Sequence, residues 1–500
     1  MRWVCAAVVL AIAAPGCAAR DSHAVSPLGG SRTSWRYDVV PVADGAELAI
    51  EAWLPPGSLA DLVVKSGAEP FVRDLEVEDA DGWSDVPRRG AAFHVPECSR
   101  GCHLRYRFAL RRAAGALHSV DGAKAWGPVL EASPSVWLLH PTLAPEGTRY
   151  RFHVPAPVGG EGTTFVTGVF AADDGPPDTY EAEAANIGVA PYAAFGPMHV
   201  HHVEAVAGTT LDVAIVPGAL AVDDSAIVGW ASRSARTMAR FFGCFPIERV
   251  MVLVVPDDGT TVRHGETMGD GGASIVVEVG SRATREALDT DWVLPHEMTH
   301  LAVPSVARRH HWLEEGLAVY LQPIARARAG EIPPEEVWRE FAAGMPRGMP
   351  SSGLPEALDG ARDWARVYWG GATFCLMADL EIRLRTRNRL GLADALRGVL
   401  ASGGSVASVW DFQRVLETAD AAVGVPALET MHDEMSRRAW TVDLPALFAS
   451  LGVVVEGQNV RLVDDAPLAA LRRSITEPLP EAAPEPAACP WAAPSRMAQR

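Results

Sequence analysis

The pentapeptide HEMTH at residues 296–300, followed closely by WLEEG at residues 312–316, constrains this chain more than any other feature. Residues i and i+4 of a helix lie one turn apart on the same face, so His296 and His300 can bind one zinc ion together. Glu297 then lies beside the open coordination position of that ion. Because HExxH occurs by chance in roughly one in a few tens of chains of this length, the motif needs support from its surroundings.

A third metal ligand is predicted on a second helix, within WLEEG. A catalytic zinc usually has three protein ligands and one exchangeable water. We assign Glu315 as the third ligand and keep Glu314 as the alternative, because neighbouring helix positions diverge by about 100° and only one of them can face the metal. The expected cofactor is therefore one Zn²⁺, bound by His296, His300 and Glu315.

These residues together predict a hydrolytic reaction. A bound zinc ion lowers the pKa of its water molecule towards about 7. Glu297 then takes a proton from this zinc-activated water as the general base, and later gives a proton to the leaving amine. Two simpler interpretations stay open, namely Glu297 as a helix-surface carboxylate and Glu315 as a first-turn residue that the helix dipole stabilises.

HEMTH followed by WLEEGLAVY resembles the gluzincin metallopeptidases of the peptidase MA-like clan, in which a glutamate ligand follows HExxH. The sequence VYWGGA at residues 367–372 resembles the YxKGA helix start of those enzymes, and the closest likeness is to the glycyl aminopeptidase and aminopeptidase N families. The resemblance implies that Tyr368 is catalytic and stabilises the tetrahedral oxyanion, a role that suits a phenol donor. The alternative is an aromatic side chain that packs at a helix start.

Three departures from those families leave the specificity open. Only fourteen residues separate His300 from Glu315, Gly370 replaces the lysine of YxKGA, and no GAMEN-like segment is present to anchor the amino end of a substrate. In the equivalent segment, GETMGDGGA, Glu266 or Asp270 could bind an amine, although each is typical of a loop carboxylate. The sequence does not choose between aminopeptidase and endopeptidase action.

A substrate peptide is expected to pair with a strand predicted at residues 273–279. We thus expect a zinc metallopeptidase that acts on a peptide or protein substrate. Two other functions remain open, a non-catalytic envelope protein that keeps the gluzincin scaffold for binding, and a metallohydrolase that acts on a non-peptide amide or ester. The formal net charge of -18 argues against nucleic acid or an anionic membrane as a partner.

Residues 1–17 predict an export signal of lipoprotein type. Arg2 is followed by an apolar run at residues 4–14, which is too short to span a membrane. Small residues then precede Cys17, as at bacterial lipoprotein processing sites, and ordinary cleavage nearby is the alternative. We expect an exported lipoprotein in the periplasm or outer membrane, held to the membrane only through a lipid on Cys17.

An oxidising compartment favours disulfide bonds. Cys98 and Cys102 are close enough in sequence for a small local disulfide, and a structural zinc pair is the competing interpretation. Cys244, Cys375 and Cys489 are expected to be buried or free thiols.

A chain of 500 residues is too long for one ordinary core, so the sequence predicts a multi-domain α+β protein. An antiparallel β-sandwich is expected first, and then a thermolysin-like, mostly α-helical catalytic domain with a small β-sheet. The predicted parts are the signal at 1–17, a polar tether at 18–36, the β-sandwich at 37–223, the catalytic domain at 224–443, a small strand-turn-strand and helix element at 444–477, and a disordered Pro/Ala-rich tail at 478–500.

The elements expected to carry the site lie in the catalytic domain. We predict a motif helix that starts near residues 290–292 and ends before Pro304, and a second helix at 311–322 that Pro323 ends or kinks. The other predicted elements are a helix at 226–242, a buried strand at 250–255, a Gly-rich turn at 269–272, helices over 334–439 and a strand pair at 453–463. His199, His201 and His202 could bind a metal, but a strand near the domain junction is preferred.

Overall fold

The computed structural model describes residues 34–42, 45–156, 163–350, 357–435, 441–479 and 489. The predicted signal, most of the tether and most of the tail lie outside the described residues. None of the helices in the described ranges combines the length and the apolar composition that a membrane span requires. The α+β class is confirmed, because the structure contains five β-sheets and many helices among these residues.

The first half of the chain is built from three sheets. The seven-stranded sheet has the order β14 (Thr179–Glu183), β12 (Arg149–His153), β1 (Ser34–Val42), β2 (Glu47–Pro56), β8 (Arg100–Phe108), β4 (Val72–Asp79) and β5 (Gly82–Asp85). One four-stranded sheet has the order β13 (Thr164–Thr167), β15 (Ala193–Gly196), β10 (Val129–Ala132) and β9 (Ala123–Trp126). The other has the order β11 (His140–Pro141), β3 (Asp61–Val63), β7 (Ala92–His94) and β6 (Arg88–Arg89), and the short helices α1 (Leu110–Ala114) and α2 (Pro134–Trp137) accompany them.

The expected purely antiparallel arrangement is wrong for the largest sheet. Strands β1 and β12 pair in parallel, with Ser34 opposite Arg149, whereas β1 and β2 pair antiparallel. A short connection forces β1 and β2 to run in opposite directions, but β12 arrives about a hundred residues later and its direction is free. The predicted period of two is confirmed, since Trp35, Tyr37 and Val39 of β1 are buried and the residues between them are not.

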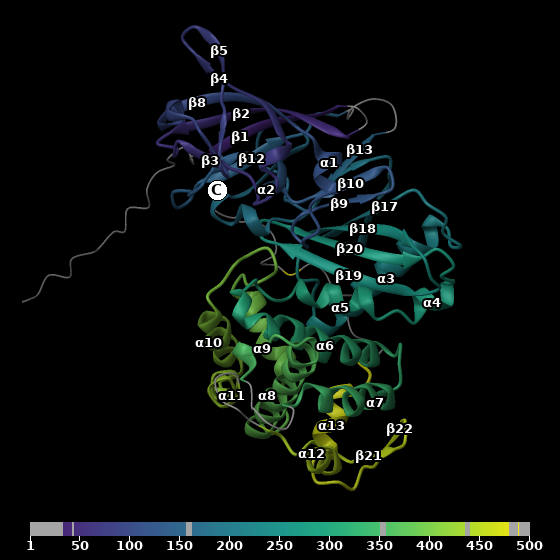
Figure 1. Ribbon diagram of the computed structural model, residues 1–500. Coiled ribbons are helices and arrows are strands. Elements are labelled where there is room, and N and C mark those ends of the chain that lie inside the picture. Colours follow the sequence, from purple (N-terminus) through teal and green to yellow (C-terminus); the bar gives the residue numbers. More distant parts are fainter. Residues whose placement is uncertain are drawn as a thin grey trace, which may run out of the picture. The chain divides into compact units, whose positions relative to one another are not determined.

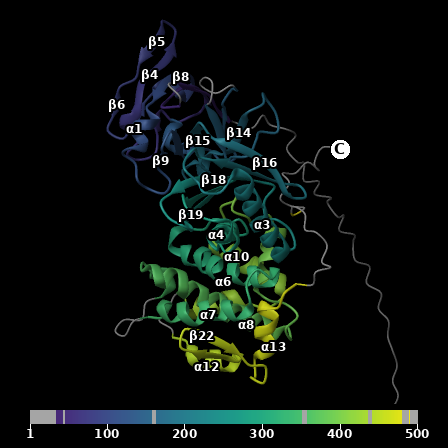
Figure 2. The same cartoon turned by 90° about the vertical axis from the view of Figure 1, so that its right-hand side faces the viewer.

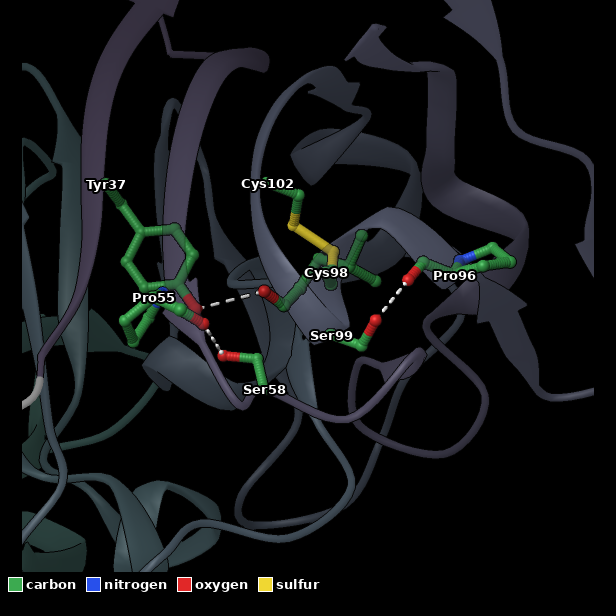
Figure 3. The surroundings of a disulfide bond; sticks show 8 residues. Tyr37, Pro55, Ser58, Pro96, Cys98, Ser99 and Cys102 are labelled. Carbon is green, nitrogen blue, oxygen red and sulfur yellow. Dashed lines mark hydrogen bonds between the residues drawn. A yellow bond between two sulfur atoms is a disulfide. The ribbon is translucent and has the colours of Figure 1, made fainter.

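A disulfide bond joins Cys98 and Cys102, as the spacing predicts (Figure 3). It links the 3₁₀ turn Pro96–Ser99 to the start of β8. The Ser99 hydroxyl donates to the carbonyl of Pro96 at 2.8 Å, which closes the same turn (Figure 3). The competing zinc-pair interpretation is therefore not supported.

A second disulfide, between Cys244 and Cys489, corrects the expectation that both are unpaired thiols. The partners are 245 residues apart, so no local spacing in the sequence indicates the pair. The amide of Cys489 also donates to the carbonyl of Phe245, and the amide of Leu479 donates to that of Arg328. The predicted disordered tail is thus attached at these two described positions. Cys375 is a free, buried thiol, as expected.

A five-stranded sheet carries the site. Its order is β16 (His199–Val206), β17 (Thr209–Ile215), β18 (Arg249–Asp257), β20 (Ala273–Gly280) and β19 (Val262–Gly269). The three central strands run parallel, and β16 and β19 are antiparallel edge strands. Because β16 and β17 precede residue 223, this sheet includes strands from both sides of the predicted domain boundary.

Both faces of the five-stranded sheet are covered. In β18, Val250, Val252 and Val254 pack in the helical core, whereas Met251 and its alternating neighbours pack with residues of β10, β13 and β15. In Figure 1, helices α3 (Asp224–Phe242) and α5 (Val293–His300) lie on one side of the sheet and strands β9 and β10 on the other. Burial on both faces explains the continuous apolar run of the strand.

Helix α4 (Arg285–Asp289) precedes α5 and lies near the sheet, whereas the helices that follow α5 lie on its side away from the sheet (Figure 1 and Figure 2). The helices after α5 are α6 (His311–Ala329), α7 (Pro334–Gly344), α8 (Gly371–Arg385), α9 (Leu392–Ala401), α10 (Phe412–Val423), α11 (Ala427–Met435), α12 (Leu444–Leu451) and α13 (Ala469–Thr476). The predicted strand pair is present as β21 (Val453–Glu456) and β22 (Asn459–Leu462). Helix α6 passes through Pro323 and ends at Ala329, so the prediction that it ends near Gln322 is wrong. The contacts of α6 with α3, α5, α7 and α8 stabilise the helix beyond Pro323, although this residue has no N–H to donate.

Candidate active site

Helix α5 is set in place from its first turn. The Asp291 carboxylate accepts hydrogen bonds from the amides of Val293 at 2.9 Å and Leu294 at 3.0 Å, and so caps the helix. Pro295 lies in this first turn, where its missing N–H leaves no helical bond unmade. The buried helix then carries His296 and Glu297 inwards.

Two glycines bring α6 and α8 together beside the motif. A Cβ atom added to Gly316 would lie 2.4 Å from the carbonyl carbon of Gly371, so the two helices touch through their backbones. Gly316 follows Glu315 directly, and Gly371 begins α8 three residues after Tyr368. The close approach therefore places the predicted third ligand and the predicted oxyanion donor at one site.

The three predicted metal ligands converge. The Nε2 atoms of His296 and His300 lie 3.4 Å and 3.8 Å from Oε2 of Glu315, and the three ligand atoms lie within 4.8 Å of one another. Ligands bound to a tetrahedral zinc at about 2.0–2.1 Å lie about 3.4 Å apart, which is close to this spacing. Oε2 of Glu315 is buried and accepts no hydrogen bond from any described residue. These residues fit a zinc ion.

The charges of His300 and Glu315 favour metal binding. Burial lowers the pKa of His300 to about 4, so its imidazole is neutral near pH 7 and can donate a lone pair. Burial alone would raise the pKa of Glu315, but the imidazoles of His300, His296 and His311 outweigh it and hold that pKa well below its ordinary value. Ligation requires a neutral imidazole and an ionised carboxylate. Burial alone would lower the pKa of His296, but its hydrogen bond with Glu315 and the Glu297 carboxylate outweigh burial and raise that pKa, so a metal ion competes with a proton at this imidazole.

Glu314, the alternative ligand, is turned away from the two histidines of the motif. Its Oε2 atom lies 2.9 Å from Nδ1 of His311, and its Oε1 atom accepts a hydrogen bond from the Val306 amide at 3.4 Å. Nε2 of the same His311 ring lies 3.1 Å from Oε1 of Glu315. His311 therefore bridges the two carboxylates and leaves Oε2 of Glu315 facing His296 and His300.

Strand β19 holds Glu297 from the other side. The Thr267 hydroxyl donates to Oε2 of Glu297 at 2.7 Å and to its backbone carbonyl at 3.2 Å. A Cβ atom on Gly265 would lie 2.5 Å from Cγ of Glu297, so only glycine fits there without displacement. Burial raises the pKa of Glu297. Sequence reasoning missed Thr267 and Gly265, because only the register of β19 against α5 identifies them.

Tyr368 lies in a short π-helix, Arg366–Gly370, at the entrance to α8. Its ring stacks parallel to the imidazole of His296, with 6.3 Å between centroids, and against the ring of Trp364 at 4.8 Å. Burial and the Glu315 and Glu297 carboxylates raise the pKa of Tyr368, so its hydroxyl keeps its proton at neutral pH. The structure thus brings this predicted residue to the site, and short π-helical segments within helices are frequent at functional sites.

The two carboxylates considered as amine anchors do not face this site. Side chains alternate along a strand, so Glu266 points away from Glu297, and it accepts a bond from Lys124 Nζ at 2.7 Å. Asp270 is buried behind the sheet, where burial raises its pKa to about 7. The pairing of a substrate with residues 273–279 is also wrong, because β18 and β19 occupy both edges of β20. Strand β19 is the open edge.

The three histidines of β16 are structural. Nδ1 of His199 and Nε2 of His201 each lie 3.0 Å from Oδ2 of Asp224, at the start of α3. Nδ1 of His202 lies 2.6 Å from Oδ1 of Asp212 in β17. The preferred interpretation, a strand near the junction of the two halves, is confirmed.

A second cluster combines His310, Asp359 and His432, whose ligand atoms also lie within 4.8 Å of one another. His310 contacts Oδ1 of Asp359 at 2.9 Å, and His432 contacts Oδ2 at 3.3 Å. The indole of Trp312 donates to Oδ1 at 2.7 Å. Each carboxylate oxygen already has a partner, in contrast to Oε2 of Glu315. We therefore interpret the cluster as a hydrogen-bonded connection between the start of α6 and helix α11.

A cavity of about 640 Å³ opens onto the site. Its wall includes His296, Glu297 and Tyr368, and the exposed rings of Trp292 and Trp364. Helix α7 supplies another part of the wall. The cavity is large enough for several side chains of a substrate.

Comparisons with known proteins show the fold. Neither protein-family models nor curated proteins give a match. Among solved structures, the chain is similar to an aminopeptidase N family protein from Idiomarina loihiensis, with a TM-score of 0.63 and 14% identity, covering 84% of this chain and 79% of that chain. An M1 zinc metallopeptidase from Deinococcus radiodurans matches with a TM-score of 0.48 and 16% identity over 83% of this chain and 94% of that chain. The first likeness confirms the aminopeptidase N-like fold expected from the sequence.

Proposed function

We propose that this protein is a zinc-dependent metallopeptidase of the gluzincin type. The observation that carries the proposal is the convergence of His296, His300 and Oε2 of Glu315 around one point, with Glu297 beside them at the wall of the cavity. The aminopeptidase N-like fold supports it. A mere binding protein would have no need for a complete ligand set together with an oriented general base.

His296, His300 and Glu315 would hold one zinc ion. When bound at such a site, the ion lowers the pKa of a coordinated water molecule and draws electron density from a carbonyl oxygen. The imidazoles and the carboxylate would bind it through Nε2 and Oε2, and His311 keeps the second oxygen of Glu315 engaged.

Glu297 has the position and the pKa of a general base. The Thr267 hydroxyl fixes Oε2 of Glu297, which leaves Oε1 to accept a proton from the attacking water. The pKa of this carboxyl is shifted upwards, towards neutral pH, so the group can take a proton and later pass it to the leaving amine. Tyr368, protonated at neutral pH, donates from its hydroxyl to the oxyanion that develops on the attacked carbonyl.

The substrate proposed is a peptide or protein segment. The open edge of β19 presents backbone groups beside Glu297, and an extended substrate can pair with such an edge. We also propose export to the bacterial cell envelope, with a lipid on Cys17. The apolar run before Cys17 and the two disulfides, which are typical of oxidising compartments, support this location.

Metal removal tests the proposal. Purified protein should contain about one zinc per chain and hydrolyse a mixture of unblocked and N-acetylated peptides. A chelator should abolish hydrolysis, and added zinc should restore it. His300→Ala should lose the tight zinc site, whereas His94→Ala, at an exposed histidine in β7, should keep it. Wild-type protein that binds no zinc when zinc is supplied would overturn the assignment.

A further inference from the structure

One face of helix α7 lines the cavity of the proposed active site. The lining residues on this helix and the following turn recur at helical spacing: Arg339, Glu340, Ala343, Gly344 and Arg347. The opposite face of α7, with Val337, Trp338 and Phe341, packs in the core. Glu340 is therefore held towards the cavity by the burial of its own helix.

Small residues follow Glu340 on the same face of α7. Ala343 lies one turn further along the same face. A Cβ atom on Gly344 would lie 2.3 Å from the ring of Trp369, another residue of the cavity wall, so this position is limited to glycine. Glu340 and Ala343 thus line the cavity, whereas Gly344 lets the ring of Trp369 pack against α7.

The other charged groups of this wall are already engaged. Arg263 donates to Asp257 at 2.7 Å, and Nε of Arg339 donates to Glu336 at 2.8 Å. The guanidinium of Arg347 lies over the ring of Trp364, 5.6 Å from its centroid.

His264, also in the wall, lies 3.2 Å from Glu266. Among the residues that the structure describes, the Glu340 carboxylate makes no hydrogen bond or ion pair of its own.

An anion in this environment favours a cation as its ligand. Burial and the nearby Glu336 carboxylate raise the pKa of Glu340 by more than Arg326 and Arg339 lower it, which means that its charge is incompletely solvated. A cationic group of a bound substrate would replace the lost hydration and form a charge-assisted hydrogen bond.

We propose that Glu340 binds a cationic group of the substrate, an ammonium or guanidinium, within the cavity that holds the catalytic residues. The inference rests on the proposed function and deepens it, because it names a specificity-determining residue. The cation can come from a lysine or arginine side chain or from a free N-terminus, and the two sources share the same chemistry.

Four tripeptide amides distinguish these sources: Ala-Lys-Ala and Ala-norleucine-Ala, each with a free and with an acetylated N-terminus. Amidation removes the terminal carboxylate, so Arg347 has no anion to bind. The isosteric variant Glu340→Gln is compared with Glu335→Gln, a matched control at an exposed position of the same helix outside the cavity wall. The kcat/KM of each peptide is measured for the zinc-loaded proteins.

Glu340→Gln should lower kcat/KM about 10- to 100-fold for the peptides that carry the recognised cation, and leave the acetylated norleucine peptide within about twofold. If kcat/KM falls only for the peptides that contain lysine, the recognised cation is a side chain. If it falls only for the peptides with a free amino end, the recognised cation is the N-terminus. Equal losses for all four peptides, or no loss at all, would overturn the inference.

A binding measurement tests the role of Glu340 without requiring that the protein hydrolyse any peptide. Calorimetry measures the affinity of the same four peptides for zinc-loaded Glu297→Gln protein, with and without Glu340→Gln. A cation-selective loss of affinity supports the role of Glu340 even if no peptide is hydrolysed. Hydrolysis that depends on Glu297 but shows no cation preference refutes the inference alone.

Discussion

At the scale of single residues, the site depends on side chains that orient other side chains. His311 is half exposed, yet it contacts both Glu314 and Glu315 and so determines which oxygen of Glu315 faces the motif histidines. Thr267 likewise orients Glu297, because its hydroxyl donates a hydrogen bond to Oε2 of that carboxylate. Residues that orient metal ligands commonly change metal affinity as strongly as activity.

Replacing His311 with leucine should weaken zinc binding about 10- to 100-fold, because Glu315 loses the partner of its second oxygen. Competition with a chelator of known affinity measures this change. His311→Gln, which keeps a donor, should recover part of the affinity, and His94→Leu, which removes an exposed histidine paired with Asp61, should change nothing. Equal affinity of His311→Leu and wild type would show that Glu315 is oriented without His311.

The sequence predicts the residues of the site better than the residues that support them. His296, His300, Glu315, Glu297 and Tyr368 follow from spacing and resemblance. The structure brings the ligand atoms of the first three within 4.8 Å of one another and places Glu297 and Tyr368 in the wall of the adjoining cavity. The supporting threonine and glycine of β19 are ordinary residues whose meaning depends on strand register. The site-facing carboxylate of α7 is likewise unmarked in the sequence, because an isolated glutamate on a helix is usually a solvated surface residue.

At the scale of elements, the contact between α6 and α8 is the one that assembles the site. Their backbones meet at Gly316 and Gly371, and any larger residue at either position must separate the helices. At Pro323, packing outweighs a local preference. A proline inside a helix tends to end it, but the neighbouring helices pack against α6 on several sides and the helix continues. Sequence patterns thus identify these helices well, but they do not determine where a buried helix ends.

Gly316→Ala should destabilise the protein by about 1–3 kcal/mol and weaken zinc binding, because the added methyl group overlaps the backbone of Gly371. Chemical denaturation of the zinc-free protein measures the first effect. The matched control is Gly229→Ala in α3, where the nearest atom to an added Cβ is 3.9 Å away. That change should be neutral or stabilising by up to about 1 kcal/mol. Similar behaviour of the two variants would contradict the proposed backbone contact.

At the scale of the whole molecule, long-range connections link segments that the sequence suggests are separate. The five-stranded sheet includes strands from both sides of residue 223, and the Cys244–Cys489 disulfide joins the end of α3 to the C-terminal segment. Neither connection has a local signal, since β-pairing and disulfide partners are set by three-dimensional proximity. Composition and periodicity predict the α+β class, but they do not show how the parts share strands.

The two disulfides should differ in their effect on stability. In the chain-entropy model, a cross-link that closes a longer loop restricts the unfolded chain more. Cys489→Ser should therefore lower the free energy of unfolding by about 2–4 kcal/mol, and Cys98→Ser by about 2 kcal/mol or less. Denaturant titrations under oxidising conditions measure both values. A larger loss for Cys98→Ser would contradict the argument from loop length.

The central claim, that Glu297 is the general base of a zinc peptidase, is tested most directly by Glu297→Gln. The amide keeps the size of the side chain and can still contact Thr267, but it cannot accept a proton from water. The variant should retain about one zinc per chain and lose about 10²- to 10⁴-fold in kcat for peptide hydrolysis. Unchanged turnover with zinc still bound would contradict the account.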